Sequence, residues 1–440
     1  MRTLRITLAL LLFCACSASK PDAAEAAPKH LILISIDTLR SDRLGCYGHE
    51  RETSPTIDAL AASGTLFVDA SAPSPWTKPS HASIFTGLYP VRHGADAMRG
   101  DLSKDVTTLA ERMQKAGFKT QAIVNATWLK MQGLERGFEK LEWVPYEQGD
   151  PTPSPVADAA IRAIKKIGDD ERAFLFVHFM DVHSDYTSLP AVERRFVGEY
   201  VGSFDGSTQQ LYRIAEGALQ PNDDDVAHLL DLYDAGIRQV DDQLKRLIDA
   251  LSKAGLREES LIVLTSDHGD EFLEHGGATH GHTQFEEVLR VPLIVTGGGS
   301  PTARVERPVS LVDIFSTVER AFDLAPTGGL DGEPLFTDTG RPRLQYGEAD
   351  VTFPPPAPGL VPPGNRRSVR AGRYKLHVNL RTRQVDLFDL ERDPQEQNDI
   401  SSKLPETSQL LLNRLRLHLK GEAGSTTLSD DEVALLTKAP

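Results

Sequence analysis

Short, uninterrupted apolar runs recur along the chain and predict strands that are buried on both faces. The clearest is LILISI at residues 31–36, which is more continuous than a strand with one solvated face would be. Similar runs follow at residues 121–124, 173–179, 261–265 and 291–295. Segments with helical spacing separate the runs, as in residues 227–254, where apolar side chains recur every three or four positions before Gly255. We therefore expect an α/β fold with a doubly wound, mostly parallel sheet flanked by helices.

A proline-rich stretch at residues 353–363 interrupts this pattern and is expected to form a stiff linker or an extended loop. Beyond it, two segments have the composition of short strands and one has helical spacing: 368–377, 384–390 and 404–419. We therefore expect a large α/β domain over residues 29–340. A small C-terminal α+β subdomain over residues 341–425 would include the proline-rich loop.

The first residues have the composition of a bacterial export signal. Arg2 and Arg5 flank the start of an apolar run that is too short to span a bilayer, which needs about 20 apolar residues. Ala and Cys at positions 15 and 16 then resemble a lipoprotein cleavage site, although ordinary cleavage a few residues later is an alternative. We expect residues 1–19 to be a signal peptide, Cys16 to carry lipid and residues 20–28 to be a tether. This predicts a location in the bacterial cell envelope, either periplasm or outer membrane, or outside the cell.

The net charge of the chain limits the classes of molecule that it is expected to bind. The 440 residues include 48 Lys+Arg against 63 Asp+Glu, a formal net charge of −15. Nucleic-acid binding needs a clustered basic surface, so the acidic balance argues against it. An anionic small substrate remains compatible, because a site can be locally positive on an acidic protein. Contact with a membrane is then expected only through the N-terminal lipid, and Cys46 would be the only remaining free thiol.

Polar residues follow several of the predicted strands at the point where each strand ends. Asp37 follows the first run, Asp181 and His183 follow residues 173–179, and Asp267 and His268 follow residues 261–265. Open parallel sheets bind ligands at the carboxyl ends of their strands. These residues are therefore expected to converge, although they are far apart in the sequence.

The segment 74–87 (SPWTKPSHASIFTG) predicts a helix that begins beside a reactive side chain. Thr77 suits the N-cap position and Pro79 is tolerated in the first turn, so a helix is expected over residues 78–88. Its N-terminal amides would offer a site for a tetrahedral anion. A threonine cap with no further role is the simpler alternative.

Several segments within residues 29–419 carry a combined motif set: 36–40 with 44–48, 77–87, 265–270, 286–292, and 369–375 with 386–390. Together they resemble the sulfatase family of the alkaline phosphatase superfamily. The resemblance implies a divalent metal that lowers the pKa of a nucleophile and neutralises the charge of the transferred group. By motif position, the metal ligands would be Asp37, Thr77, Asp267 and His268, and Thr77 would be the nucleophile.

The nucleophile position departs from the family pattern. Sulfatases carry Cys or Ser there, which is oxidised to formylglycine, whereas the β-carbon of Thr77 bears a methyl group and cannot become that aldehyde. His81 also stands where the conversion motif has Arg. We therefore expect no formylglycine and a covalent phospho- or sulfo-threonine instead. Its release needs water to attack the same centre, which favours phosphorus esters, including phosphodiesters, without excluding sulfate.

Other family positions are also replaced: Thr38, Asn125, Thr127 and Gly281. The leaving-group role is left to His183 and His282, with His280 in reserve, because a histidine can bind a tetrahedral oxygen or protonate a departing alkoxide. His81 is expected to bind near the anion or to hold the nucleophile. Each of these histidines has the alternative of a surface or supporting role.

One divalent ion is expected, and its identity is open. Aspartates suit calcium, while His268 admits manganese or zinc, with calcium and manganese preferred. A second metal held by Asp181, His183 and either His280 or His282 is the alternative, although Asp-x-His is not the usual spacing for it.

The leading hypothesis is an exported, metal-dependent hydrolase of sulfuric or phosphoric esters whose substrate is an anionic small molecule, glycan or lipid headgroup. A phosphoryl- or phosphoethanolamine-type transferase is the second hypothesis, and a non-catalytic binding lipoprotein is the third. Product analysis with a sugar acceptor would separate the first two, and metal analysis would separate the third. Specificity is expected from the loops at residues 185–224 and 347–365.

Overall fold

The computed structural model describes residues 27–95, 100–145, 147, 149–153, 155–337, 340, 342–350, 365–422 and 426–437. The predicted export signal with Cys16, most of the predicted tether and the proline-rich stretch 353–363 lie outside these residues. Among the described residues, no helix combines the length and the apolar composition that crossing a membrane requires.

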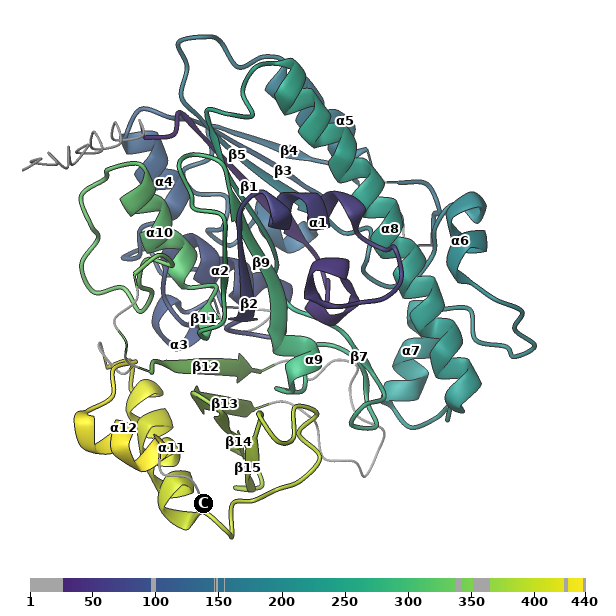
Figure 1. Ribbon diagram of the computed structural model, residues 1–440, viewed down its shortest axis with the longest axis vertical. Helices are drawn as coiled ribbons and strands as arrows, with labels where there is room; N and C mark the ends of the chain where they lie inside the picture. Colours follow the sequence, from purple (N-terminus) through teal and green to yellow (C-terminus); the bar gives the residue numbers. More distant parts are fainter. Residues whose placement is uncertain are drawn as a thin grey trace, which may run out of the picture.

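A nine-stranded sheet forms the centre of the large domain, in the order β10-β2-β9-β6-β1-β5-β3-β4, with β11 also paired to β2 (Figure 1). The strands are β1 His30–Ile36, β2 Thr65–Ser71, β3 Lys119–Val124, β4 Lys140–Trp143, β5 Ala173–Phe179, β6 Ser260–Ser266, β9 Arg290–Thr296, β10 Ala303–Val305 and β11 Val309–Ser310. Only β9 runs antiparallel to its neighbours, β2 and β6, within this sheet. The prediction of a doubly wound, mostly parallel sheet is confirmed.

Helices cover both faces of the sheet, as the continuous apolar strands require. Alternate residues of β1 enter different cores: Ile32 and Ile34 join one cluster, while Leu31 and Leu33 join the other. The first cluster includes α1 (Pro55–Ala62), α5 (Val156–Ile164) and α8 (Asp223–Lys253). The second includes α2 (Thr77–Thr86), α4 (Leu109–Lys115) and α10 (Asp313–Ala321).

Shorter elements connect these layers. They are η1 Ser41–Arg43, η2 Gly45–Tyr47, α3 Pro90–His93, η3 Thr127–Lys130, α6 Pro190–Phe196, α7 Thr208–Ala215, α9 Glu286–Leu289 and the two-stranded sheet of β7 Glu271–Phe272 with β8 Ala278–Thr279. The long helix α8 starts earlier than its apolar pattern predicts, because Asn222 and Asp225 form a capping box.

A separate antiparallel sheet forms the C-terminal subdomain, at the yellow end of the chain in Figure 1. Its strands are β12 Leu344–Ala349, β13 Arg366–Ala371, β14 Tyr374–Asn379 and β15 Val385–Asp389, and its helices are α11 Pro405–His418 and α12 Asp430–Thr437. These elements share a third core, which also includes Tyr89 and Val312 of the large domain. Buried Lys375 joins this sheet to the large domain, since its Nζ lies 2.7 Å from an oxygen of Glu286 in α9.

Candidate active site

Three of the predicted ligands meet at the carboxyl edge of the central sheet. Asp37 directly follows β1, and its backbone N–H donates to the carbonyl of Phe179 at the end of β5, at 2.8 Å. Asp267 and His268 follow the neighbouring strand β6, so parallel pairing brings them to the same edge. His268 Nε2 lies 3.8 Å from Asp37 Oδ1 and 3.4 Å from Asp267 Oδ2. All three side chains are completely buried.

The fourth predicted ligand, Thr77, enters the group from the start of α2. Its hydroxyl donates to Asp37 Oδ2 at 3.4 Å and lies 3.4 Å from His268 Nε2. The prediction that Thr77 is the N-cap is wrong by one residue: Trp76 is the extended N-cap residue and Thr77 is the first helical residue. The hydroxyl therefore contacts the ligand group instead of capping the helix, while the N-terminal turn of α2 still lies beside it.

The four residues fit a single divalent cation. Asp37 Oδ1 and Asp267 Oδ2 are buried and have no hydrogen-bond partner among the described residues, and such acceptors are costly unless a cation neutralises them. An ion bound at about 2.0–2.1 Å by a tetrahedral donor set holds neighbouring donors about 3.3–3.4 Å apart. The separations of Thr77 from Asp37 and from His268, each 3.4 Å, match that spacing.

Burial also sets the ionisation of this group. It raises the pKa of Asp37, and it raises the pKa of Asp267 to about 6, with the neighbouring charge of Asp37 adding to the shift. Burial lowers the pKa of His268 to about 3, and His280 contributes in the same direction. Because His268 is neutral at pH 7, it offers a ring lone pair and no charge that could neutralise the two carboxylates.

The side chain of His81 lies beneath the first turn of α2 and contacts the backbone of Thr77. Its Nδ1 is 2.8 Å from the carbonyl oxygen of Thr77, and its Nε2 is 2.9 Å from Ser35 Oγ in β1. Both ring nitrogens are therefore engaged with protein atoms. Of the two roles predicted for His81, holding Thr77 is the one that these contacts match.

His280 connects the remaining predicted histidines, His183 and His282, to His268. The ring of His280 is 4.4 Å from that of His268 and 5.1 Å from that of His183, and its Nδ1 is 2.8 Å from Asp270 Oδ1. His282 contacts the carbonyl of His280 through Nδ1, and its Nε2 is 3.8 Å from Glu271. His280, kept in reserve at the sequence level, is thus in ring contact with the ligand group.

Residues 29–324 match the family model described as Sulfatase. The chain belongs to the sulfatase family. Its predicted membership is thereby confirmed, and with it the assignment as an ester hydrolase.

Individual relatives agree in sequence and fold. Arylsulfatase A of Homo sapiens is 26% identical over 392 residues, which cover 80% of this chain and 75% of that protein. The structure of BT4656 in complex with its substrate D-glucosamine-2-N,6-O-disulfate aligns with a TM-score of 0.75 at 17% identity, covering 90% of this chain and 99% of that one. Phosphonate monoester hydrolase of Agrobacterium radiobacter aligns with a TM-score of 0.71 at 20% identity, covering 90% and 95%.

Two residues of this sulfatase-family site were not singled out from the sequence. Trp76 stacks obliquely on His280, with ring centroids 5.3 Å apart. His178 in β5 places Nε2 3.3 Å from Asp37 Oδ2, while its Nδ1 faces Asn125 Oδ1 at 3.1 Å. A histidine near the carboxyl end of an otherwise apolar strand is the signal that points to His178.

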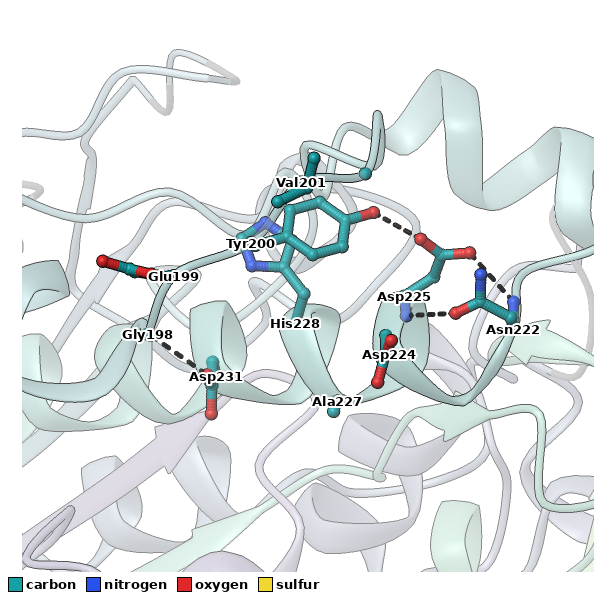
Figure 2. A pocket seen from close by; sticks show the side chains of 11 residues that line it. Gly198, Glu199, Tyr200, Val201, Asn222, Asp224, Asp225, Ala227, His228 and Asp231 are labelled. Atoms are coloured by element: carbon teal, nitrogen blue, oxygen red, sulfur yellow. Dashed lines mark hydrogen bonds between the residues drawn. The ribbon is translucent and has the colours of Figure 1, made fainter.

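A hollow of about 510 Å³ lies at the N-terminal end of α8, and its lining residues 198–202 belong to the loop predicted to carry specificity (Figure 2). Tyr200 stacks on His228 at 3.8 Å and donates to Asp225 at 2.5 Å. Glu199, Asp224 and Asp231 also line it. This acidic lining is unsuited to an anionic ester, and none of its residues belongs to the group around Thr77.

Proposed function

We propose that this member of the sulfatase family hydrolyses sulfuric or phosphoric esters with Thr77 as the nucleophile, beside a divalent cation. The cation would be held by Asp37, Thr77, Asp267 and His268. The observation that carries this proposal is the position of the Thr77 hydroxyl, 3.4 Å from both Asp37 Oδ2 and His268 Nε2 at the start of a buried helix.

The metal, when bound, would lower the pKa of the Thr77 hydroxyl and neutralise charge on the transferred group. Asp37, whose pKa is raised by burial, accepts the hydroxyl proton to which it is already hydrogen bonded. The first-turn amides of α2 orient the sulfate or phosphate oxygens. His81 holds the Thr77 carbonyl, so the nucleophile keeps its place at the head of the helix.

The two chemical steps need one proton donor and one proton acceptor. In the first, a bond forms between Thr77 Oγ and sulfur or phosphorus while the bond to the leaving oxygen breaks, and that oxygen takes a proton from His183. In the second, water attacks the same atom and its proton passes to His280, while the bond to Thr77 breaks and Thr77 Oγ takes back the proton held by Asp37. The proton on His280 then returns through solvent to His183. The Nδ1 of His280 is engaged by Asp270, which leaves its Nε2 to accept.

The donor set favours manganese or zinc over calcium. Calcium takes six to eight oxygen ligands, whereas this set includes an imidazole and two carboxylates. We propose an anionic ester on a small molecule, glycan or lipid headgroup as substrate. Phosphorus esters, including phosphodiesters and phosphonates, are favoured by the threonine nucleophile, because its covalent adduct leaves only by a second displacement.

We also propose export to the bacterial cell envelope, with cleavage after residue 15 and lipid on Cys16. Only the composition of the N-terminal residues supports this part. Metabolic labelling with a radioactive fatty acid tests it, using Cys16→Ala, which should lose the label, against Cys14→Ala, which should keep it.

The catalytic proposal is tested with a panel of sulfate monoester, phosphate monoester, phosphodiester and phosphonate substrates, each with calcium, manganese and zinc. Thr77→Ala should lower turnover at least about 10³-fold while the protein stays folded. Thr77→Ser is the matched control and should retain measurable turnover, because it keeps a hydroxyl at the same place. Undiminished turnover in Thr77→Ala would sink the assignment.

A further inference from the structure

His178 and His268 share an arrangement that prepares a ring nitrogen for a cation. The Nδ1 of His268 faces the carbonyl oxygen of Gly269 at 3.0 Å, and the Nδ1 of His178 faces Asn125 Oδ1 at 3.1 Å. Since a carbonyl or amide oxygen only accepts, each Nδ1 carries the ring proton. In the neutral ring, each Nε2 is then left with a bare lone pair.

Both of these Nε2 atoms lie against the same carboxylate. His268 Nε2 is 3.8 Å from Asp37 Oδ1, and His178 Nε2 is 3.3 Å from Asp37 Oδ2. His178 Nε2 is buried and has no hydrogen-bond partner among the described residues. Two electron-rich atoms this close repel one another in a dry interior unless a cation lies between them.

His81 provides a contrast within the same group. Its ligating atoms and those of His178 and Asp267 lie within 4.8 Å of one another. However, His81 donates its Nδ1 proton to the Thr77 carbonyl, and its Nε2 is engaged by Ser35. His81 is therefore occupied at both nitrogens, whereas His178 is occupied at one.

The fold explains why His178 reaches this point. It stands opposite Ser35 in the pairing of β5 with β1, one residue before the strand ends. Its neighbours on the same face, Phe174 and Phe176, belong to the core beneath α2. The side chain of His178 therefore lies under the helix that carries Thr77, and its ring is 5.0 Å from that of His81.

We propose that His178 is a fifth ligand of the cation and supplies a second imidazole through Nε2. The inference rests on the proposed function, since it assumes the metal at Asp37, Thr77, Asp267 and His268. The 3.3 Å separation of His178 from Asp37 is as short as the separations within the rest of the set, which run from 3.4 to 3.8 Å. A second imidazole also favours zinc or manganese over calcium.

X-ray absorption of the zinc-loaded protein tests this by counting imidazole ligands. We expect two in the unaltered chain and one in His178→Ala, whose zinc affinity should fall at least about 100-fold, the upper end of the loss from a supporting residue. His81→Ala is the matched control, because it removes a neighbouring buried histidine and should leave the count at two.

The count in the unaltered chain decides the matter even if a variant fails to fold. One imidazole would overturn the inference and leave His178 as a positioning residue that donates to Asp37. A preparation that binds no zinc would overturn the proposed metal centre itself, which is a different failure. His178→Gln, with an amide of similar reach, should also show one imidazole; a count of two in that variant would contradict the inference.

Discussion

Glu287 is a buried carboxyl group of α9. Burial raises its pKa to about 9, and the charge of Glu271 adds to the shift. Its Oε1 lies 3.6 Å from His275 Nε2. Glu287 is therefore protonated in the folded protein at pH 7, whereas the unfolded chain ionises it near its ordinary value of 4.5.

This difference predicts a pH-dependent stability. The contribution of protonated Glu287 is fully present below pH 4.5 and is lost as the pH rises towards 9, because unfolding then releases a proton. Glu287→Gln should raise the free energy of unfolding at pH 8 by up to about 4 kcal/mol relative to its effect at pH 5. Urea unfolding at both values measures this, with exposed Asp249→Asn as the control. Equal effects of Glu287→Gln at the two pH values would contradict the assignment.

The residues around Asp37 differ in how far their positions follow from the local sequence. Asp37, Asp267 and His268 are predicted to meet because each follows an apolar strand, whereas Thr77 joins them only through its motif position in the family resemblance. His178 near the end of an apolar strand is a local signal, but that signal does not say which residue the histidine contacts until the neighbouring strand is known. Pairing with β1 sets it beside Asp37, and that register is not written in the local pattern.

At the scale of an element, α2 is held at both ends. It begins at Thr77 and is closed by the C-cap residue Gly87, which is left-handed at φ +66° and donates its N–H to the Ser83 carbonyl at 2.9 Å. A Cβ on Gly87 would lie 3.1 Å from the Cβ of Phe315 in α10. The end of the helix thus needs glycine both for its conformation and for its packing.

Gly87→Ala should therefore lower the free energy of unfolding more than the same substitution does at other left-handed glycines. Gly117 is the matched control, because it is left-handed at φ +86° but no atom lies within 4 Å of the position that a Cβ would take. We expect the free energy of unfolding to fall by about 1 kcal/mol in Gly117→Ala and by roughly 2–4 kcal/mol in Gly87→Ala. Thermal unfolding of both variants measures the difference, and equal costs would show that contact with Phe315 does not matter.

Local patterns of apolar residues predict the long strands and helices. They do not predict elements whose presence or direction depends on tertiary contacts. The strands at β1, β3, β5, β6 and β9 and the helices α2, α8 and α11 were expected. Strand β2 was not, because its apolar run is broken by Asp69, which pairs with Arg370 of the C-terminal sheet at 2.7 Å. The antiparallel direction of β9 cannot be predicted from its own residues, because an apolar run indicates a buried strand but not its direction in the sheet.

At the scale of the domains, a buried charge cluster joins the C-terminal sheet to α9 of the large domain. Lys375 is almost fully buried, with Nζ 2.7 Å from Glu286 and 3.1 Å from Glu396. Burial alone would raise the pKa of Glu286, but Lys375 and Arg370 more than offset it and hold the pKa at about 2. The cluster is therefore ionised, and each charge depends on the others.

Removing one charge of this cluster should destabilise the protein more than removing two opposite charges together. Lys375→Met should cost about 3–5 kcal/mol, because it leaves two buried carboxylates facing each other. Adding Glu286→Gln to that variant should recover part of the loss, although Glu286→Gln alone should be destabilising. Urea unfolding of the two single variants and the double variant measures the coupling. The exposed pair of Lys245 with Asp249 is the control, and additive costs at Lys375 and Glu286 would contradict the coupling.

Metal removal should destabilise the whole large domain. The cation would bind only where β1, β6 and α2 meet, so it would stabilise the folded state alone. Each tenfold increase in free zinc above the dissociation constant should add about 1.4 kcal/mol to the free energy of unfolding. Melting temperature with zinc and with chelator measures this. Asp267→Asn should abolish most of the dependence, and an unchanged melting temperature in the unaltered chain would contradict a metal at this site.

The position of β1 at the middle of the sheet has a consequence for the order of events during synthesis. Its two partners begin at Ala173 and Ser260, far later in the chain, so a ribosome completes this apolar strand long before either neighbour exists. Until then HLILISI has no edge to pair with, and such segments are the ones that aggregate during slow folding. We therefore expect the nascent chain to depend on a holding chaperone until β6 emerges.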